Sequence, residues 1–463
     1  MLTERELEKV LYAALGKGGD FADIYIERKD ANGITCESDK IEKIHSGIDF
    51  GAGIRVVFQE KTAYAYTNDV TLEGLLDAAV IVSKAVNSGG SSDVTINLNK
   101  KEVKDVSPVK YLPGDIPVED KVALVERGNA VARAYDNRVR QVTVAYGDNI
   151  SDITVANSEG LFVQGTRIRT RMICSVVVSS GGIIQTGFES GGGTAGFEFF
   201  LNSTTPEEIC RNAAARAVLM LDSRPAPAGR MAVVMAAEAG GTMVHEACGH
   251  GMEADLVQKG LSVYAGKTGE KVASDVVTVV DDAAVPNKYG SFSFDDEGTV
   301  SQKKVLIEKG VLKTYMYDYL TARRDKRPST GNGRRESFRH KPIPRMTNTY
   351  IAPGEYDPQE IVAKTKRGLF VKKMGGGQVN TTNGDFVFDV SEGYLIENGK
   401  VTAPVRGATL TGNGPEVLRI IDMVGGDLGW GIGTCGKDGQ GVPVSDAQPT
   451  VRIPEIIVGG ILE

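Results

Sequence analysis

The chain is organised around one segment in its middle, Gly241-Thr242-Met243-Val244-His245-Glu246-Ala247-Cys248-Gly249-His250-Gly251-Met252-Glu253-Ala254-Asp255. Two of the four histidines of the chain lie here and flank a glutamate in an H-E-x-x-x-H arrangement. The segment follows a short apolar run, residues 231–235, which predicts a buried strand. A strand followed by such a histidine pair is typical of a helix that binds a catalytic metal.

The residue types of this segment suit zinc chemistry. A catalytic Zn²⁺ usually has three protein ligands and one open position, where a water molecule ionises near a pKa of about 7. A carboxylate beside a ligand can take the proton of that water, which contributes roughly 10²–10⁴ in rate. His245 and His250 are therefore candidate ligands, and Glu246 is the candidate general base.

The spacing of the two histidines predicts an irregular turn. Metalloprotease helices place their histidines at i and i+4, whereas His245 and His250 are five residues apart. At about 100° per residue, an α-helix would hold their rings roughly 140° apart, too far to share one ion. A π-type turn, or a helix that ends at Gly249, would bring both rings to the same side. We therefore expect such a turn between the two histidines.

Three residues compete for the position of third ligand. Cys248 and Glu253 belong to the same segment, and Cys435 lies in a glycine-rich run, residues 425–440, that we expect to form a close-packed loop. A thiolate is a good zinc ligand, but spacing alone ranks the three candidates equally. The G-x-G-x-x-G pattern at 431–436 is no dinucleotide site, because no helix-forming segment follows it. A single buried histidine is more often a core residue than a ligand; the pair with its glutamate favours a metal site.

The composition is that of an ordinary soluble globular protein. Hydrophobic residues make up 41% and charged residues 24% of the 463, and the net charge of −7 argues against bulk binding to nucleic acid or to anionic membranes. No apolar run reaches the roughly 18 residues that span a bilayer, and the first residues lack the pattern of a signal peptide. Five scattered cysteines without a C-x-x-C motif make no disulfide framework. We expect a cytoplasmic protein.

The hydrophobic patterns predict an α+β fold in two domains. Residues 1–225 are expected to form an antiparallel sheet covered by helices, and residues 226–463 a β-rich domain with a curved or barrel-like sheet that carries the metal-binding helix. After the histidine segment the pattern is β throughout. The expected helices span residues 3–16, 71–86, 118–135 and 204–221, and the expected strands include residues 23–28, 34–38, 53–59, 63–67, 272–280, 304–307, 312–317, 386–390, 393–397 and 451–458.

Turn residues divide the strands. Residues 157–160 and 179–182 suit hairpins, and the Asn398-Gly399 pair is a strong hairpin signal. Residues 190–196, Ser-Gly-Gly-Gly-Thr-Ala-Gly, are too glycine-rich for regular structure. We interpret them either as a flexible flap over a site or as a plain surface loop.

Residues 323–345, the basic segment, carry nine lysines or arginines against two acidic residues. Such a run is either solvated surface or a loop that attracts a carboxylate or a polarised carbonyl, to which arginine forms paired hydrogen bonds. A nucleic-acid role is disfavoured, because the run has one aromatic residue and the rest of the chain is acidic. The substrate-binding candidates in this segment are Arg334, Arg335, Arg339 and His340.

Several motifs together resemble the TldD branch of the TldD/PmbA metallopeptidase family. They are H-E-A-C-G-H-G at 245–251, R-R-E-S-F-R-H at 334–340 with P-R-M-T-N-T at 344–349, G-G-G-Q-V at 375–379 and C-G-K-D-G-Q at 435–440. The resemblance extends from the N-terminal helix to the C-terminus. The PmbA-type branch lacks the histidine motif, so this chain resembles the catalytic branch.

The resemblance implies a zinc peptidase in which His245, His250 and Cys435 bind Zn²⁺ and Glu246 is the catalytic base. It also implies peptide or unfolded protein substrates, and a heterodimer with a PmbA/TldE-like subunit or a homodimer. Two other functions fit the same residues. One is an amidase that acts on small molecules in a closed pocket. The other is a non-catalytic peptide-binding subunit with a structural metal, whose fourth position a protein side chain would fill.

Overall fold

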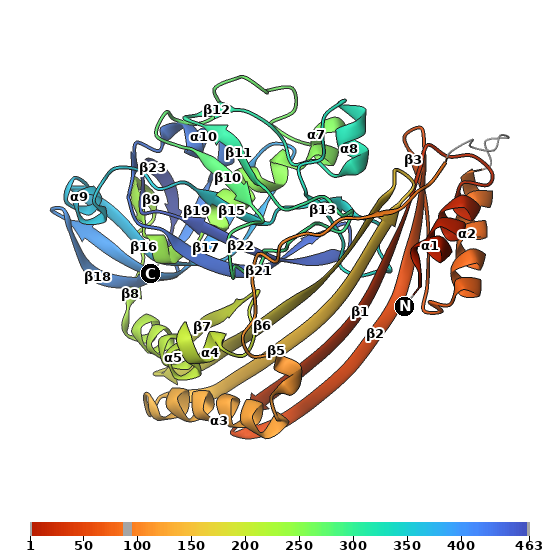
Figure 1. Cartoon of the computed structure of the whole chain (residues 1–463). Helices are drawn as coiled ribbons and strands as arrows, with labels where there is room; N and C mark the ends of the chain where they lie inside the picture. Colours follow the sequence, from red (N-terminus) through yellow and green to blue (C-terminus); the bar gives the residue numbers. More distant parts are fainter. Residues whose placement is uncertain (1, 87–94, 461–463) are drawn as a thin grey trace.

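The computed structural model describes residues 2–86 and 95–460, and it has a mixed α/β architecture. A long, curved antiparallel sheet forms the N-terminal half, and a barrel and a second sheet form the C-terminal half (Figure 1). The two halves face each other across the concave side of the long sheet. The predicted fold class is therefore confirmed, whereas the division at residues 225 and 226 stays a proposal.

The N-terminal sheet has the strand order β3-β2-β1-β5-β6, and both β4 and β7 pair with β6. Its central strands are longer than the sequence patterns predict, because β1 pairs on both sides and continues through the polar residues between the two expected strands. Pairing with two neighbours outweighs the weak strand propensity of these residues. The strands are β1 (Phe21–Glu37), β2 (Lys40–Phe58), β3 (Lys61–Thr67), β4 (Asn99–Lys100), β5 (Val139–Asn157), β6 (Leu161–Ser180) and β7 (Ile183–Gly193).

Helices cover the two ends of one face of this sheet (Figure 1). The helix α1 begins with the predicted capping box, in which Thr3 and Glu6 satisfy each other's backbone amides. One apolar core lies under α1 and α2, and another lies under α3 and α5. The helices are α1 (Glu4–Ala14), α2 (Leu72–Val86), α3 (Val118–Ala134), α4 (Phe199–Asn202) and α5 (Pro206–Asp222), which agree with the expected positions apart from the four-residue α4.

The glycine-rich residues 190–196 are partly regular, so the expectation of irregular structure, as a flap or as a surface loop, is wrong for the first four of them. Residues up to Gly193 belong to β7 and pair with β6. A side chain at Gly192 would meet the backbone of Thr170, and one at Gly191 would meet Ile209 on α5. Glycine is needed here for close packing between strands and helix rather than for mobility.

Five strands of the C-terminal half close into a barrel. The ring runs β16-β9-β23-β19-β17, and β17 pairs back to β16, so the predicted barrel-like sheet is confirmed. The predicted hairpin at Asn398-Gly399 joins β17 to β18, with both residues at positive φ. The strands are β8 (Arg224–Pro225), β9 (Gly229–Met235), β16 (Arg367–Val379), β17 (Asp385–Glu397), β18 (Lys400–Arg406), β19 (Thr409–Asn413), β20 (Met423–Val424) and β23 (Val451–Gly459).

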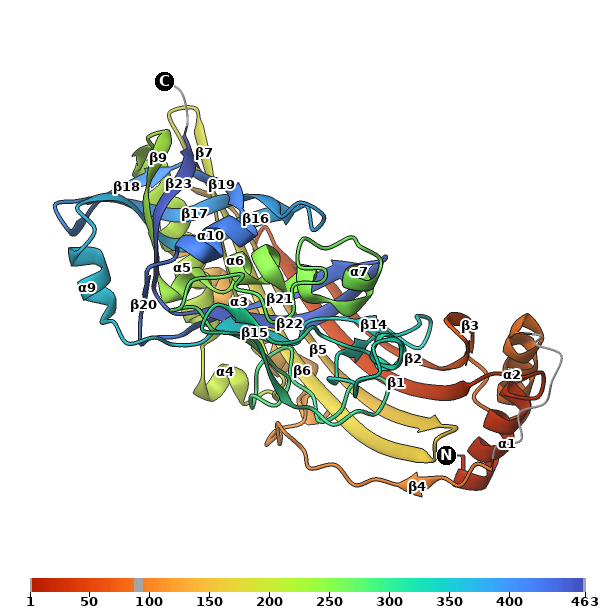
Figure 2. The same cartoon turned by 90° about the horizontal axis from the view of Figure 1, so that it is seen from above.

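A six-stranded sheet packs beside the barrel in the order β12-β11-β10-β15-β22-β21 (Figure 2). Its last strand, β21, is at the edge and pairs with β22 within the described part of the chain. The strands of this sheet are β10 (Val279–Asp282), β11 (Lys303–Glu308), β12 (Val311–Leu312), β15 (Asn348–Ile351), β21 (Gly429–Lys437) and β22 (Gln440–Gln448). A separate two-stranded sheet consists of β13 (Gly333–Arg334) and β14 (Ile343–Pro344).

The expectation of β-structure throughout this half is wrong in places. Short helices interrupt the strands, because capping side chains such as Asp318, Asp357 and Asn413 satisfy the first backbone amides of each helix. Two expected strands, 272–280 and 312–317, are mostly irregular. The helices are α6 (Thr242–Val244), α7 (Ala254–Gln258), α8 (Tyr319–Arg324), α9 (Pro358–Ala363) and α10 (Gly414–Ile420). In residues 2–86 and 95–460, no helix combines the length and the apolarity needed to cross a bilayer.

Candidate metal centre

The two histidines lie on an irregular helical segment, as their spacing predicts. One turn of α-helix, α6, leads into a π-helical turn over His245–Gly249 and then a 3₁₀ turn over His250–Met252. The π-turn brings the rings of His245 and His250 to one side, with centroids 5.1 Å apart. Gly249 permits this path, because a Cβ there would lie 2.1 Å from the sulfur of Met346.

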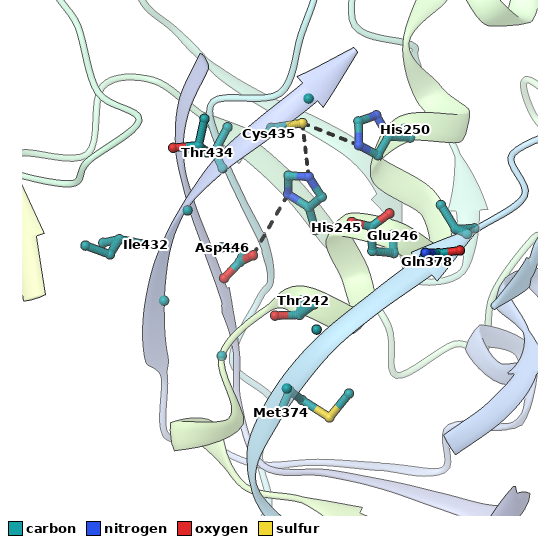
Figure 3. Close-up of a pocket in the computed structure, with 18 of the residues that line it drawn as sticks. Thr242, His245, Glu246, His250, Met374, Gln378, Ile432, Thr434, Cys435 and Asp446 are labelled. Carbon is teal, nitrogen blue, oxygen red and sulfur yellow. Dashed lines mark hydrogen bonds and ion pairs between the residues drawn. The ribbon is translucent and has the colours of Figure 1, made fainter. Parts of the chain in front are cut away.

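Cys435 faces the two histidines from the edge strand β21 (Figure 3). Its Sγ lies 3.3 Å from Nε2 of His245 and 3.4 Å from Nε2 of His250. The expectation that Cys435 lies on a close-packed loop is wrong, since residues 429–437 pair in register with β22. Because β21 pairs with β22, the backbone of Cys435 is fixed close to the histidine segment, which is nearly two hundred residues away in sequence.

The geometry of these three side chains fits a zinc ion. Their ligand atoms all lie within 4.8 Å of one another. A tetrahedral site with bonds of about 2.0–2.1 Å to nitrogen and 2.3 Å to sulfur holds nitrogen and sulfur roughly 3.5 Å apart. The two nitrogen–sulfur distances are close to that value. Two imidazoles and a thiolate leave one of four positions open.

The charges of the cluster support each other. Burial alone would raise the pKa of Cys435, but hydrogen bonds and charge interactions with His245 and His250 outweigh it and lower that pKa to about 5. Burial opposes the charged form of both histidines, yet their partners raise the pKa of each above its usual range. For His250 the main partner is Glu253, and for His245 it is Cys435. The thiolate form of Cys435, which binds metals, is therefore favoured at neutral pH.

Glu246 lies beside this cluster on the wall of a cavity (Figure 3). Burial raises the pKa of its carboxyl group, and the nearby His245 and His250 act in the opposite direction. The side chain is only partly exposed. A carboxylate at this place can exchange a proton with a molecule in the cavity.

The other two candidate ligands point elsewhere. Cys248 donates to the carbonyl oxygen of Val244 in the apolar core, and burial raises its pKa to about 12. Glu253 lies behind His250, with Oε2 3.1 Å from Nδ1, the ring nitrogen opposite the one that faces Cys435. Among the three candidates that residue spacing left open, Cys435 is the one that contacts both histidines.

The cavity has a volume of about 900 Å³ and lies between the two halves of the molecule. The strands that contribute walls include the edge strand β21, the barrel strand β16 with Gly375 and Gly376, and the edge strand β7 of the N-terminal sheet. One interpretation of residues 190–196 placed them over a site, and Ser190 does line the cavity. Sequence reasoning missed Phe188 and Glu189 of β7, because no local pattern connects them with a site in the other half. The missed lining residues include Phe188, Glu189, Thr242, Lys373, Met374 and Asp446.

The predicted substrate-binding residues of the basic segment do not line this cavity in the part of the chain that the structure describes. Arg334 donates to the carbonyl oxygens of Met346 and Pro443 and is buried. The other three have partners away from the cluster: Arg335 contacts Asp296 and Tyr64, Arg339 pairs with Asp49, and His340 pairs with Ser337.

Two imidazoles, of which His245 is buried and His250 partly exposed, and a thiolate beside a carboxylate, on the wall of an open cavity, form the kind of site found in metal-dependent hydrolases. Comparisons with known proteins agree with this class. The PmbA/TldA metallopeptidase C-terminal domain matches residues 228–460, the central domain matches residues 111–221, and domain 1 matches residues 22–85.

Relatives match almost the whole chain. A metalloprotease TldD homolog of Haemophilus influenzae is 38% identical over 452 residues, which cover 95% of this chain and 93% of the relative. A zinc metalloprotease TldD homolog of Saccharolobus solfataricus is 28% identical and covers 96% of this chain and 97% of the relative. The structure of TldE from Thermococcus kodakarensis has a similar fold, with a TM-score of 0.77 at 21% identity over 98% of this chain and 100% of that one.

The chain belongs to the PmbA/TldD metallopeptidase family, as its motifs suggest. Its enzyme class is that of the metal-dependent peptidases.

Proposed function

We propose that the protein is a zinc-dependent peptidase that cleaves extended, unfolded peptide chains, with His245, His250 and Cys435 as metal ligands and Glu246 as general base. The observation that carries this proposal is the convergence of the three ligand atoms within 4.8 Å beside Glu246, on the wall of the cavity. The family resemblance implies the same roles, and the positions of the four side chains support them independently.

Zinc is supported by the donor set. Two imidazole nitrogens and a thiolate suit Zn²⁺ better than Mg²⁺ or Ca²⁺, which prefer oxygen ligands. One relative, from Saccharolobus solfataricus, is itself described as a zinc metalloprotease. A zinc ion held by these residues would supply a Lewis acid and lower the pKa of a water molecule to about 7.

Glu246 would move the protons of the reaction. Its carboxylate is adjacent to His245 in sequence and faces the cavity, so it can accept a proton from a water molecule there and later deliver it to the leaving amine. A pKa raised by burial brings this group closer to neutral pH, where a base that also acts as an acid is most effective.

The strand β21 would bind the peptide. It is the edge of the six-stranded sheet, and its residues 431–437 line the cavity, so an extended chain can add to it by main-chain hydrogen bonds. Main-chain hydrogen bonds depend little on the side chains of the bound peptide, which favours broad specificity. A folded protein offers no free strand, so unfolded chains and peptides are the expected substrates.

The two alternative functions are less well supported. The two edge strands that border the cavity can each pair with an extended peptide, which a small amide would not use. Cys248 and Glu253, which could close a structural metal site, have other partners. We therefore favour an open, catalytic position at the metal.

The fold shared with TldE and the family as a whole support a second subunit, either a PmbA/TldE-like chain or a copy of this chain. Five free thiols support the predicted cytoplasmic location, where cysteines stay reduced. Both remain proposals.

The variant Glu246→Gln tests the proposed base. We expect cleavage of casein or a short peptide to fall by roughly 10²–10⁴, because the amide cannot accept the proton, while zinc content measured by elemental analysis stays unchanged. The matched control is Glu270→Gln, at an exposed glutamate of the same half away from the cavity. Both variants are assayed with and without a PmbA/TldE-like chain, and full activity of Glu246→Gln would eliminate Glu246 as the base.

A further inference from the structure

Behind His250 lies a buried ionic cluster that has no part in the proposed reaction. Oε2 of Glu253 is 3.1 Å from Nδ1 of His250, and the glutamate is fully buried. The other ring nitrogen, Nε2, faces Cys435 at 3.4 Å. The imidazole is thus held between a carboxylate on one side and the thiol on the other.

Lys437 joins this carboxylate to the strand of Cys435. Its Nζ lies 3.2 Å from Oε2 of Glu253 and 2.6 Å from Oδ1 of Asp255, and it donates to the carbonyl oxygen of Pro344 at 2.9 Å. Lys437 follows Cys435 by two residues on β21. One buried ammonium group therefore connects the helical segment of the histidines with the strand of the third ligand.

Arg345 strengthens the same connection. It is fully buried and donates to the backbone oxygens of Cys435 and Gln440, and its Nε lies 3.8 Å from Oε1 of Glu253. Two cations thus neutralise the Glu253 carboxylate, and one of them holds the backbone of Cys435 directly. A buried carboxylate without such partners would be costly.

The surroundings of His245 are different. Oδ2 of Asp446 lies 3.9 Å from Nδ1 of His245, beyond hydrogen-bond distance, and Nδ1 has no hydrogen-bond partner within the described residues. The Asp446 carboxylate instead accepts from the backbone amide of Gly241 at 3.2 Å. Both rings contact Cys435 through Nε2, but only His250 has a carboxylate partner at hydrogen-bond distance from its Nδ1.

We propose that Glu253, held in place by Lys437, is a positioning residue: it keeps the proton of His250 on Nδ1 and so directs the free Nε2 towards a metal ion beside Cys435. A carboxylate accepts a hydrogen bond only from a protonated nitrogen, which leaves the other nitrogen as the ligand. Carboxylates that orient metal-binding histidines typically contribute 10–100-fold in metal affinity. The inference rests on the proposed function only in taking His250 and Cys435 as metal ligands.

Zinc alone is the probe for the test, measured by competition with a chromogenic chelator. We expect Glu253→Ala to weaken zinc binding roughly 10–100-fold. Glu253→Gln should restore most of the affinity, because its amide oxygen still accepts from Nδ1. The matched control, Glu270→Ala, at an exposed glutamate that does not line the cavity, should change zinc affinity less than threefold.

A second readout separates orientation from simple loss of structure. The chain has only four histidines, so ¹⁵N-edited NMR can follow the Nδ1 proton of His250 in the zinc-loaded protein. That proton should exchange slowly with solvent in the wild type and in Glu253→Gln, and rapidly in Glu253→Ala. A double variant, Glu253→Leu with Lys437→Met, removes both charges, keeps the volume similar and should show the same weakened binding if Glu253→Ala fails to fold.

Wild-type zinc affinity in a folded Glu253→Ala, or in the double variant, would overturn the proposal. So would a folded Glu253→Gln that binds zinc no better than Glu253→Ala. Neither result depends on peptide cleavage. A protein that binds zinc with the expected pattern but cleaves no peptide would contradict the proposed function and leave the role of Glu253 intact.

Discussion

Two segments of the C-terminal half carry dense groups of ionisable side chains, residues 241–255 and the basic segment, residues 323–345. In residues 241–255, the side chains of His245, Glu246 and His250 lie close together and line the cavity. In the second, the arginines at 334 and 335 are buried, and their guanidinium groups donate to backbone carbonyl oxygens. The difference teaches that ionisable side chains form a site only where the fold turns them towards one another on the wall of a cavity.

The basic segment still contributes to the site indirectly. Arg345 at its end donates to the backbone of Cys435, and Arg334 donates to the carbonyl oxygen of Pro443 on β22, the strand that pairs with β21. Burial and the neighbouring Arg169 lower the pKa of Arg334 to about 9. The segment therefore acts as a scaffold that holds β21, the strand of the proposed third ligand, Cys435.

The largest effect is expected from Cys435→Ala. It removes a ligand rather than a ligand's partner, so zinc affinity should fall by more than the roughly 100-fold upper range for partner residues, and peptide cleavage should disappear with the metal. Chelator competition and elemental analysis measure this. Cys248→Ala is the matched control and should keep its zinc. If Cys435→Ala retained its zinc, the proposal that Cys435 rather than Cys248 is the third ligand would be wrong.

An intermediate effect is expected from Arg334→Met, which tests the scaffold role. Two buried carbonyl oxygens lose a charged donor, so the free energy of unfolding should fall by about 2–4 kcal/mol. Urea denaturation measures this change. At a temperature where the variant stays folded, KM for a peptide should equal the wild-type value. A raised KM with unchanged stability would instead support the substrate-binding role that the sequence predicts for Arg334.

The smallest effect is expected from Arg339→Gln. Its paired hydrogen bonds with Asp49, one of 2.8 Å, are partly exposed, so the cost at pH 7 should be below about 1 kcal/mol. The hydrogen bond from Arg339 lowers the pKa of Asp49 in the folded state, although burial opposes this. The contribution is therefore present above pH 3.8 and lost as pH falls through the lowered pKa. Urea denaturation measures the free energy of unfolding of variant and wild type, and the difference between them should be smaller at pH 3 than at pH 7.

Local sequence patterns were sufficient for the elements whose stability is local. The capping box of α1, the hairpin at Asn398-Gly399 and the π-turn between the histidines follow from side chains and spacing within a few residues. Spacing could not single out Cys435 as the proposed third ligand, because Cys435 comes close to the histidines only through the pairing of β21 with β22. The role of Glu253 was missed for a similar reason: its charge partner, Lys437, is far away in sequence.

By itself, the amino-acid sequence determined the chemistry available to this protein: a glutamate between two histidines, an unpaired cysteine and alternating strands that require an α+β fold. These features depend on residue types and short-range geometry. Only the tertiary structure decided which side chains would meet, that β7 of the N-terminal sheet would border the cavity, and that the basic segment would be buried. Such contacts depend on packing between segments far apart in the chain, and no local spacing encodes them.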